Sequence, residues 1–129
     1  MHRLADKDKI WNRACQGGGD SPRPGDTALA ALLLFHGPTM NGGVLHAVEC
    51  LNTEQLAAAK AGYKYFGFFS IPELIANAER AINEGQDLES IEATLDKQYW
   101  AVIPDDGVLT TSFEYHQSQH PSEYSPVGR

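Results

Sequence analysis

The chain has 129 residues, 42% of them hydrophobic, and a formal net charge of −7. That length suffices for one domain with its own core, without disulfides or metals. Two cysteines are too few for a disulfide framework or zinc knuckle, and no apolar run is long enough to span a membrane, so we expect a cytoplasmic protein. Residues 1–72 hold six acidic and seven basic side chains, whereas residues 73–129 hold eleven acidic and three basic ones. Such an acidic second half would repel nucleic acid and favour basic partners.

The first half of the chain predicts a short helix, a loop and a central helix. The helix covers residues 1–14, and the Gly/Pro-rich loop covers residues 16–25. Asp26 is expected to be the N-cap of the next helix. That helix contains Ala28–Phe35, which is apolar all round and therefore belongs in the middle of the fold. We expect His36-Gly37-Pro38 to end it.

The motif Asn41-Gly42-Gly43 joins this central helix to the amphipathic run Val44–Leu51. Glycine is a poor helix residue and is usually kept where the backbone turns or approaches a neighbour closely. We predict that Asn41 caps the following helix and that the glycines let helices approach. Replacing Gly42 with valine should then destabilise the fold more than a surface substitution does.

Capping patterns define the helices of the second half. Asn52 with Gln55, and Ser70 with Glu73, are capping boxes, the second with a hydrophobic staple from Phe69 to Leu74. Gly85 is predicted to be a left-handed C-cap. Further expected features are an N-cap at Asp87, a strand or coil at Trp100–Ile103, a turn and cap at Pro104–Gly107, a last helix ended by Pro121, and a frayed tail over residues 121–129.

These segments predict the fold class. No segment alternates between apolar and polar residues for long, which argues against strands. The expected fold is all-α, a compact bundle-like single domain over residues 1–129 with six to seven short helices.

No set of side chains in the sequence predicts catalysis, a cofactor or a metal site. His116 and His120 share one helix face and could hold a metal, but no Glu sits beside His116 and Pro121 lies at the helix end. We therefore expect a polar C-terminal turn whose histidines favour the helix dipole. His36 and His46 are expected to be histidines at a helix end or the core edge, and Cys15 to be buried or idle, as is Cys50. Aromatic residues close in sequence are expected to pack in the core rather than stack on bases: Tyr63, Tyr65, Phe66, Phe68 and Phe69.

From Asn41-Gly42-Gly43 and the helices around it, the chain resembles a bacterial domain family of unknown function that includes an acidic DNA-mimic protein. The corresponding segments are Ala28–Phe35, Asn41–Leu51, Leu56–Phe69 and Ile71–Ile82. Leu45 and His46 stand where that family commonly has aromatic residues. The resemblance implies an all-α fold, often dimeric, without known enzymatic activity.

The resemblance and the charge together favour a non-enzymatic protein-binding domain whose acidic face contacts a basic partner, such as a DNA-binding protein. The candidate partner-binding carboxylates are Glu84, Asp87, Glu89, Glu92, Asp96, Asp105 and Asp106. Glu89, Glu92 and Asp96 share one helix stripe. An immunity or antitoxin protein is an alternative. A third is a small-molecule binder or enzyme at the Asn41-Gly42-Gly43 corner, using His36 or His46.

Overall fold

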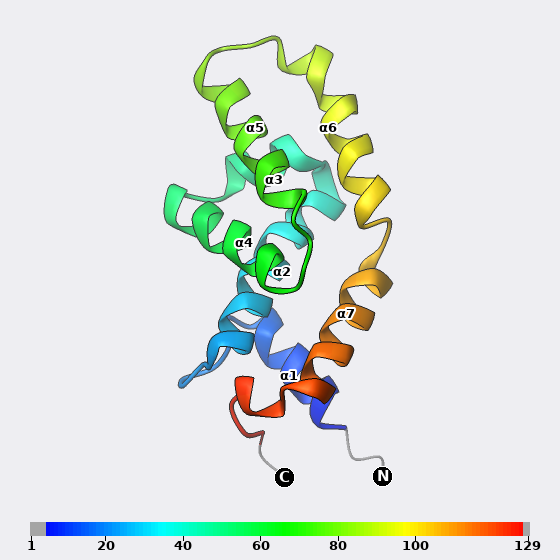
Figure 1. Cartoon of the computed structure of the whole chain (residues 1–129). Helices are drawn as coiled ribbons and strands as arrows, with labels where there is room; N and C mark the ends of the chain where they lie inside the picture. Colours follow the sequence, from blue (N-terminus) through cyan, green and yellow to red (C-terminus); the bar gives the residue numbers. More distant parts are fainter. Residues whose placement is uncertain (1–4, 128–129) are drawn as a thin grey trace.

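A computed structural model describes residues 5–127, and its seven α-helices confirm the all-α prediction. They are α1 (Asp6–Cys15), α2 (Pro24–Gly42), α3 (Val44–Cys50), α4 (Thr53–Tyr65), α5 (Ile71–Asn83), α6 (Leu88–Val102) and α7 (Asp106–Gln119), followed by the 3-10 helix η1 (Pro121–Glu123). Helices α5 and α6 project at one end of the molecule, and α1, α7 and η1 lie at the other (Figure 1). Across residues 5–127, none of the helices combines the length and apolar character needed to cross a membrane.

Helix α2 is central, as its composition predicts, and packs against α1, α3 and α4. Leu29, Leu32 and Phe35 are almost completely buried on one side of it. Its other side is less covered, and Leu34 remains 45% exposed. The open side forms the wall of a cavity described below.

Helix α2 continues through Pro38 to Gly42, so the prediction that it ends at His36-Gly37-Pro38 is wrong. Proline disfavours helical backbone at the preceding residue partly by contacting that residue's Cβ. Gly37 has no Cβ, which removes this obstacle. The hydroxyl of Thr39 donates to the carbonyl of Phe35 at 2.8 Å, which adds a side-chain bond within this disturbed turn.

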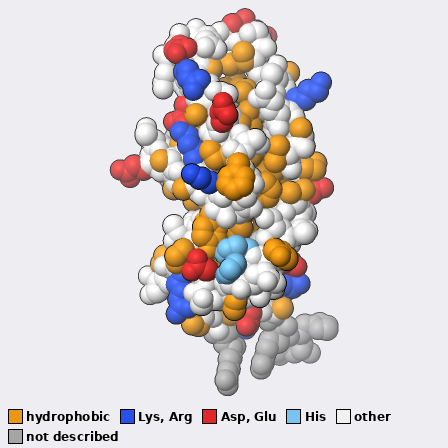
Figure 2. Space-filling model, in the orientation of Figure 1, with side chains coloured by type: hydrophobic (Ala, Val, Ile, Leu, Met, Phe, Trp, Pro, Cys, Tyr) orange, Lys and Arg blue, Asp and Glu red, His pale blue; other side chains and the backbone are white. Residues whose placement is uncertain are grey.

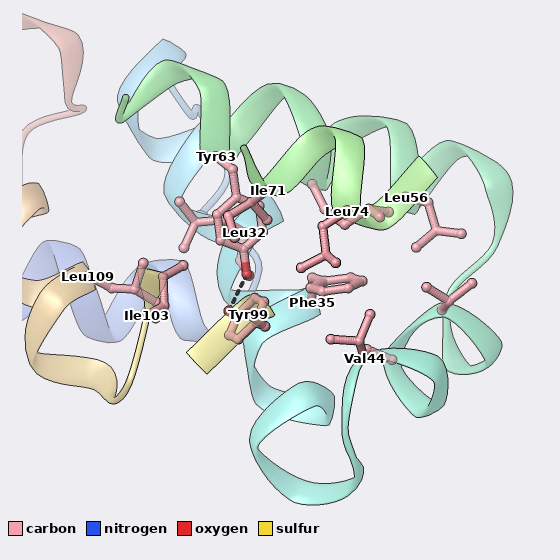
Figure 3. Close-up of a cluster of buried hydrophobic side chains, with 14 of the residues drawn as sticks. Leu32, Phe35, Val44, Leu56, Tyr63, Ile71, Leu74, Tyr99, Ile103 and Leu109 are labelled. Carbon is pink, nitrogen blue, oxygen red and sulfur yellow. Dashed lines mark hydrogen bonds between the residues drawn. The ribbon is translucent and has the colours of Figure 1, made fainter. Parts of the chain in front are cut away.

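The core lies where α3 to α6 surround the buried side of α2. Figure 3 shows Phe35 and Tyr99 beside Val44, with Leu56, Ile71 and Leu74 from neighbouring helices completing the cluster. At its α7 side, Ile103 and Leu109 extend the same apolar interior. The segment Trp100–Ile103, predicted as strand or coil, is the end and C-cap of α6.

Some of the predicted local caps form and others do not. Asn52 and Gln55 form the predicted capping box at α4, with bonds of 2.8 and 2.9 Å. Gly85 has φ 68° and follows α5, as predicted; its amide bonds the carbonyl of Ile82 and the next amide bonds that of Ala81, which is the Schellman arrangement. Ser70 makes no capping bond, so the second capping box is wrong.

The predicted staple at α5 is also absent, because the Phe69 side chain is 71% exposed instead of packing on Leu74. Tyr63, in contrast, is fully buried, and Phe66 and Phe68 pack against the core. The prediction that this aromatic group is core therefore holds for Tyr63, Phe66 and Phe68 but not for Phe69, and Tyr65 is only partly buried.

The Gly/Pro-rich loop is shorter than predicted, because α2 already begins at Pro24 and Gly25 lies inside it. Gly25 is buried beneath the ring of Tyr124: a Cβ added there would lie 2.6 Å from Tyr124 Cε1. Tyr124 is only 2% exposed. The predicted frayed tail is thus wrong within residues 121–127: Pro121–Glu123 form η1, Tyr124 packs on α2, and the Ser125 amide bonds Asp26 of α2. Residues 128–129 lie outside the described part.

Asp26 does not cap α2 from the N-cap position as predicted, because Arg23 occupies that position. Its carboxylate is 1% exposed and joins three segments. It accepts hydrogen bonds from Arg13 Nη2 of α1 at 2.7 Å, from the Arg23 amide at 3.0 Å and from the Ser125 amide at 2.7 Å. Asp26 therefore ties α1 and the tail to the start of α2.

Candidate functional site

A cavity of about 710 Å³ lies on the open side of α2. We call it the α1–α2 cavity. Its walls come from α1, the following loop, α2 and the first residue of α7, and they are mostly apolar. The lining residues are Trp11, Ala14, Cys15, Gly17, Pro22, Thr27, Ala30, Ala31, Leu33, Leu34, His36, Gly37, Pro38, Met40 and Asp106.

His36 and Asp106 supply the polar part of the cavity wall. His36 is 4% exposed within α2 and therefore is not at a helix end. Its Nε2 lies 2.6 Å from Asp106 Oδ1, and its Nδ1 lies 2.7 Å from the Tyr99 hydroxyl. The Asp106 side chain remains 69% exposed, so the same carboxylate faces both the histidine and solvent.

Behind His36, the Tyr99 hydroxyl lies 2.7 Å from that of Tyr63 (Figure 3). Asp106 accepts a hydrogen bond from His36 Nε2–H, and the Tyr63 hydroxyl also lies 3.4 Å from the Leu32 carbonyl, to which it can donate. Both ring nitrogens of His36 are then occupied by protein partners. The histidine can orient Asp106, but it has no free nitrogen for a ligand.

Burial raises the pKa of Tyr63 well above its usual value, and burial likewise raises the pKa of Tyr99. Unfolded tyrosines ionise near pH 10, whereas these native ones keep their protons. The protonated tyrosines therefore contribute fully to the free energy of unfolding below pH 10, and this contribution is lost progressively as the pH rises above 10. We expect Tyr63→Phe to reduce the loss of unfolding free energy between pH 9 and 11 by about 1.4 kcal/mol in total, measured by urea unfolding across that range. Equal losses in the two proteins would contradict this.

Cys15, in the cavity wall, and Cys50, on α3, are both exposed, so of the two expected states, buried or idle, the buried one is wrong. Partial burial of the sulfur, and then the Asp106 carboxylate, raise the pKa of Cys15. Because the thiolate is the reactive form, we expect Asp106→Asn to speed iodoacetamide alkylation of Cys15 at pH 7.5, followed by peptide mass spectrometry. Asp105→Asn, which removes a neighbouring charge outside the cavity wall, is the control and should change the rate less.

The Asn41-Gly42-Gly43 corner is built differently from the prediction. Asn41 lies in the last turn of α2 and does not cap α3. The Val44 amide instead donates to Asp96 Oδ1 of α6 at 2.9 Å. Gly43 has φ 95° and ψ 175°, a conformation that is essentially restricted to glycine. Its missing side chain also makes room for Asp96, whose carboxylate would lie 2.9 Å from an added Cβ.

We therefore expect Gly43→Ala to lower the unfolding free energy by about 1–3 kcal/mol, from backbone strain and displacement of Asp96. Asn41→Ala is the matched control from the same motif and should stay within about 0.5 kcal/mol of the wild type. Urea unfolding followed by circular dichroism measures both. The predicted effect of Gly42→Val remains, and its reason is now specific: an added Cβ would lie 2.6 Å from the His46 ring.

The candidate acidic residues separate into two groups. Asp96 binds the α3 amide, Asp105 caps α7 through the Gly107 amide at 2.8 Å, and Asp106 bonds His36. The remaining four are exposed around the α5–α6 connection: Glu84, Asp87, Glu89 and Glu92. On the face shown in Figure 2, acidic side chains are dispersed among basic and hydrophobic ones and form no continuous patch.

The other histidines form no metal centre in the described part of the chain, where no three His, Cys, Asp or Glu side chains are grouped for a metal. The rings of His116 and His120 lie 4.8 Å apart, as their spacing predicts, and His116 Nδ1 lies 2.8 Å from the Tyr124 hydroxyl. Burial and His120 lower the pKa of His116. His46 is exposed, with Nε2 3.5 Å from Cys50 Sγ.

Comparisons of the chain with protein-family models, with curated proteins and with solved structures found no match. His36 and Asp106 are 70 positions apart in the sequence, and only the fold brings them together. One signal in the sequence could have indicated the cavity: α2 is apolar on every side. Helix α1, with 10 residues, is too short to cover the open side of the 19-residue α2 by itself.

Proposed function

We propose that this domain binds a small molecule with an apolar body in the α1–α2 cavity. The observation that carries the proposal is the cavity itself. Its volume of about 710 Å³ lies within the range of small-molecule sites, and apolar walls with few polar groups are typical of such sites. The site lies beside the Asn41-Gly42-Gly43 corner rather than at it, because side chains of Asp96 and His46 already occupy the space next to those glycines.

Two features support a binding role without chemistry in this cavity. Both ring nitrogens of His36 are hydrogen-bonded, one to Tyr99 and one to Asp106, so His36 is not placed to take a proton from a ligand. Cys15 is the nucleophile in the wall, and its raised pKa leaves less of the reactive thiolate at neutral pH. The non-enzymatic function expected from the sequence is retained in this proposal.

The two exposed cysteines provide a test within one molecule. A neutral apolar probe, 1-octanol, should slow alkylation of Cys15 in the cavity wall while leaving alkylation of Cys50 on α3 unchanged. Ala31→Phe, which fills the cavity, should abolish this protection, and Ala58→Phe on the exposed side of α4 should not. Equal rates for Cys15 with and without the probe, together with no calorimetric binding, would overturn the proposal.

A second candidate function is favoured by the exposed carboxylates Glu84, Asp87, Glu89 and Glu92. They would bind a basic protein, as the sequence predicted, through the end of the molecule formed by α5 and α6. Capture from host lysate at low and high salt tests this, because exposed ion pairs weaken with salt. A basic partner lost on combined charge reversal of Glu84, Glu89 and Glu92 would support it, whereas capture unaffected by that reversal would contradict it.

A further inference from the structure

We infer that the ligand of the α1–α2 cavity is a protonated amine attached to an apolar body. This rests on the proposed binding function and narrows it to one chemical class. The reason is the charge of the wall. Of the fifteen residues that line the cavity, Asp106 is the one acidic side chain, and none is lysine or arginine.

Asp106 is held in place for such a contact. Its Oδ1 accepts from His36 Nε2, and His36 is itself fixed by the buried Tyr99 hydroxyl. Among the described residues, no hydrogen bond engages the second oxygen, Oδ2. The side chain is 69% exposed, so that oxygen is accessible to a ligand. An ammonium group offers three donors, and a charged N–H to carboxylate bond is about twice as strong as a neutral one.

The surroundings disfavour the other head groups. A carboxylate ligand would meet the Asp106 charge, and the overall charge of −7 adds to that repulsion. The start of α7 could attract an anion through its free amides, but Asp105 already accepts from the Gly107 amide at that point. A metal ion would need further ligands, and the described residues provide no such group here.

The experiment compares three probes that share one alkyl chain: octylamine, 1-octanol and octanoate, measured by titration calorimetry at pH 7. We expect octylamine to bind about tenfold more tightly than 1-octanol, and octanoate to bind most weakly. Asp106→Asn keeps an acceptor for His36 and should remove the preference for the amine. Asp105→Asn removes the adjacent charge outside the wall and should preserve it.

The possible failures are distinguishable. Binding of 1-octanol or octanoate as tight as that of octylamine to the wild type would overturn the amine inference and leave the binding function standing. Absence of binding by all three would overturn both. Octylamine binding that persists in Ala31→Phe would place the amine on the acidic surface and overturn the inference. The Ala31→Phe experiment does not depend on the folding of any Asp106 variant.

Discussion

The Asp26→Ala substitution is expected to lower the free energy of unfolding by about 3–5 kcal/mol, the usual cost of breaking a buried ion pair. The carboxylate is 1% exposed and accepts from Arg13, from the Arg23 amide and from the Ser125 amide. Removing it leaves the Arg13 charge in a part-buried place without its carboxylate partner. It also leaves two amide donors unsatisfied, each of which adds to the cost.

Urea unfolding of matched variants measures this effect. Asp20→Ala removes the same charge from the exposed loop before α2 and should change stability by no more than about 0.5 kcal/mol. Asp26→Asn keeps an acceptor oxygen while losing the charge, and we expect it to lie between the two. A loss for Asp26→Ala no larger than that for Asp20→Ala would show that the three-way contact is not stabilising.

The second large effect is expected at Gly62, where α4 crosses α2. A Cβ added to Gly62 would overlap the carbonyl oxygen of Ala28 and lie 3.3 Å from the amide nitrogen of Leu32. Both are backbone atoms of the central helix and cannot move independently. We expect Gly62→Ala to destabilise the fold by about 2–3 kcal/mol through overpacking, although alanine is intrinsically the better helix residue.

The control for Gly62→Ala reverses the change on the exposed side of the same helix. Ala58→Gly loses helix propensity without altering packing and should cost about 1 kcal/mol. Thermal and urea unfolding should therefore show that both variants are less stable than the wild type. The loss should be larger for Gly62→Ala, although alanine has the better helix propensity. A stabilised Gly62→Ala protein would mean that the two helices separate there without penalty.

Features determined by near neighbours could be predicted from the sequence. The Asn52–Gln55 box and the Gly85 C-cap depend on residues within one helical turn, and both form. The central place of α2 follows from its composition. The continuation of α2 past Pro38 could not be predicted in this way. Gly37, without a Cβ, permits helical backbone before Pro38, but the packing of the buried side of α2 against other helices is what favours it.

Features that join distant segments could not be predicted. Asp96 and Val44 are separated by 52 positions, and Asp26 and Ser125 by 99, yet each pair shares a hydrogen bond. A capping residue normally comes from the same helix, so Asn41 was the reasonable expectation for α3. The cavity is likewise defined by which side of α2 remains uncovered, and hydrophobic periodicity does not specify that when every side is apolar.

The contact between Arg13 and the tail has a consequence for connectivity. Arg13 Nη1 donates to the Pro126 carbonyl at 3.1 Å, so the earliest helix and the last described residues lie side by side. Because this contact joins the first and the last helical parts of the chain, a protein cleaved in the exposed segment 84–86, between α5 and α6, would still be held together by it. Such a protein would keep every tertiary contact described for α1, α2 and η1, while freeing the end of the molecule that carries the exposed carboxylates.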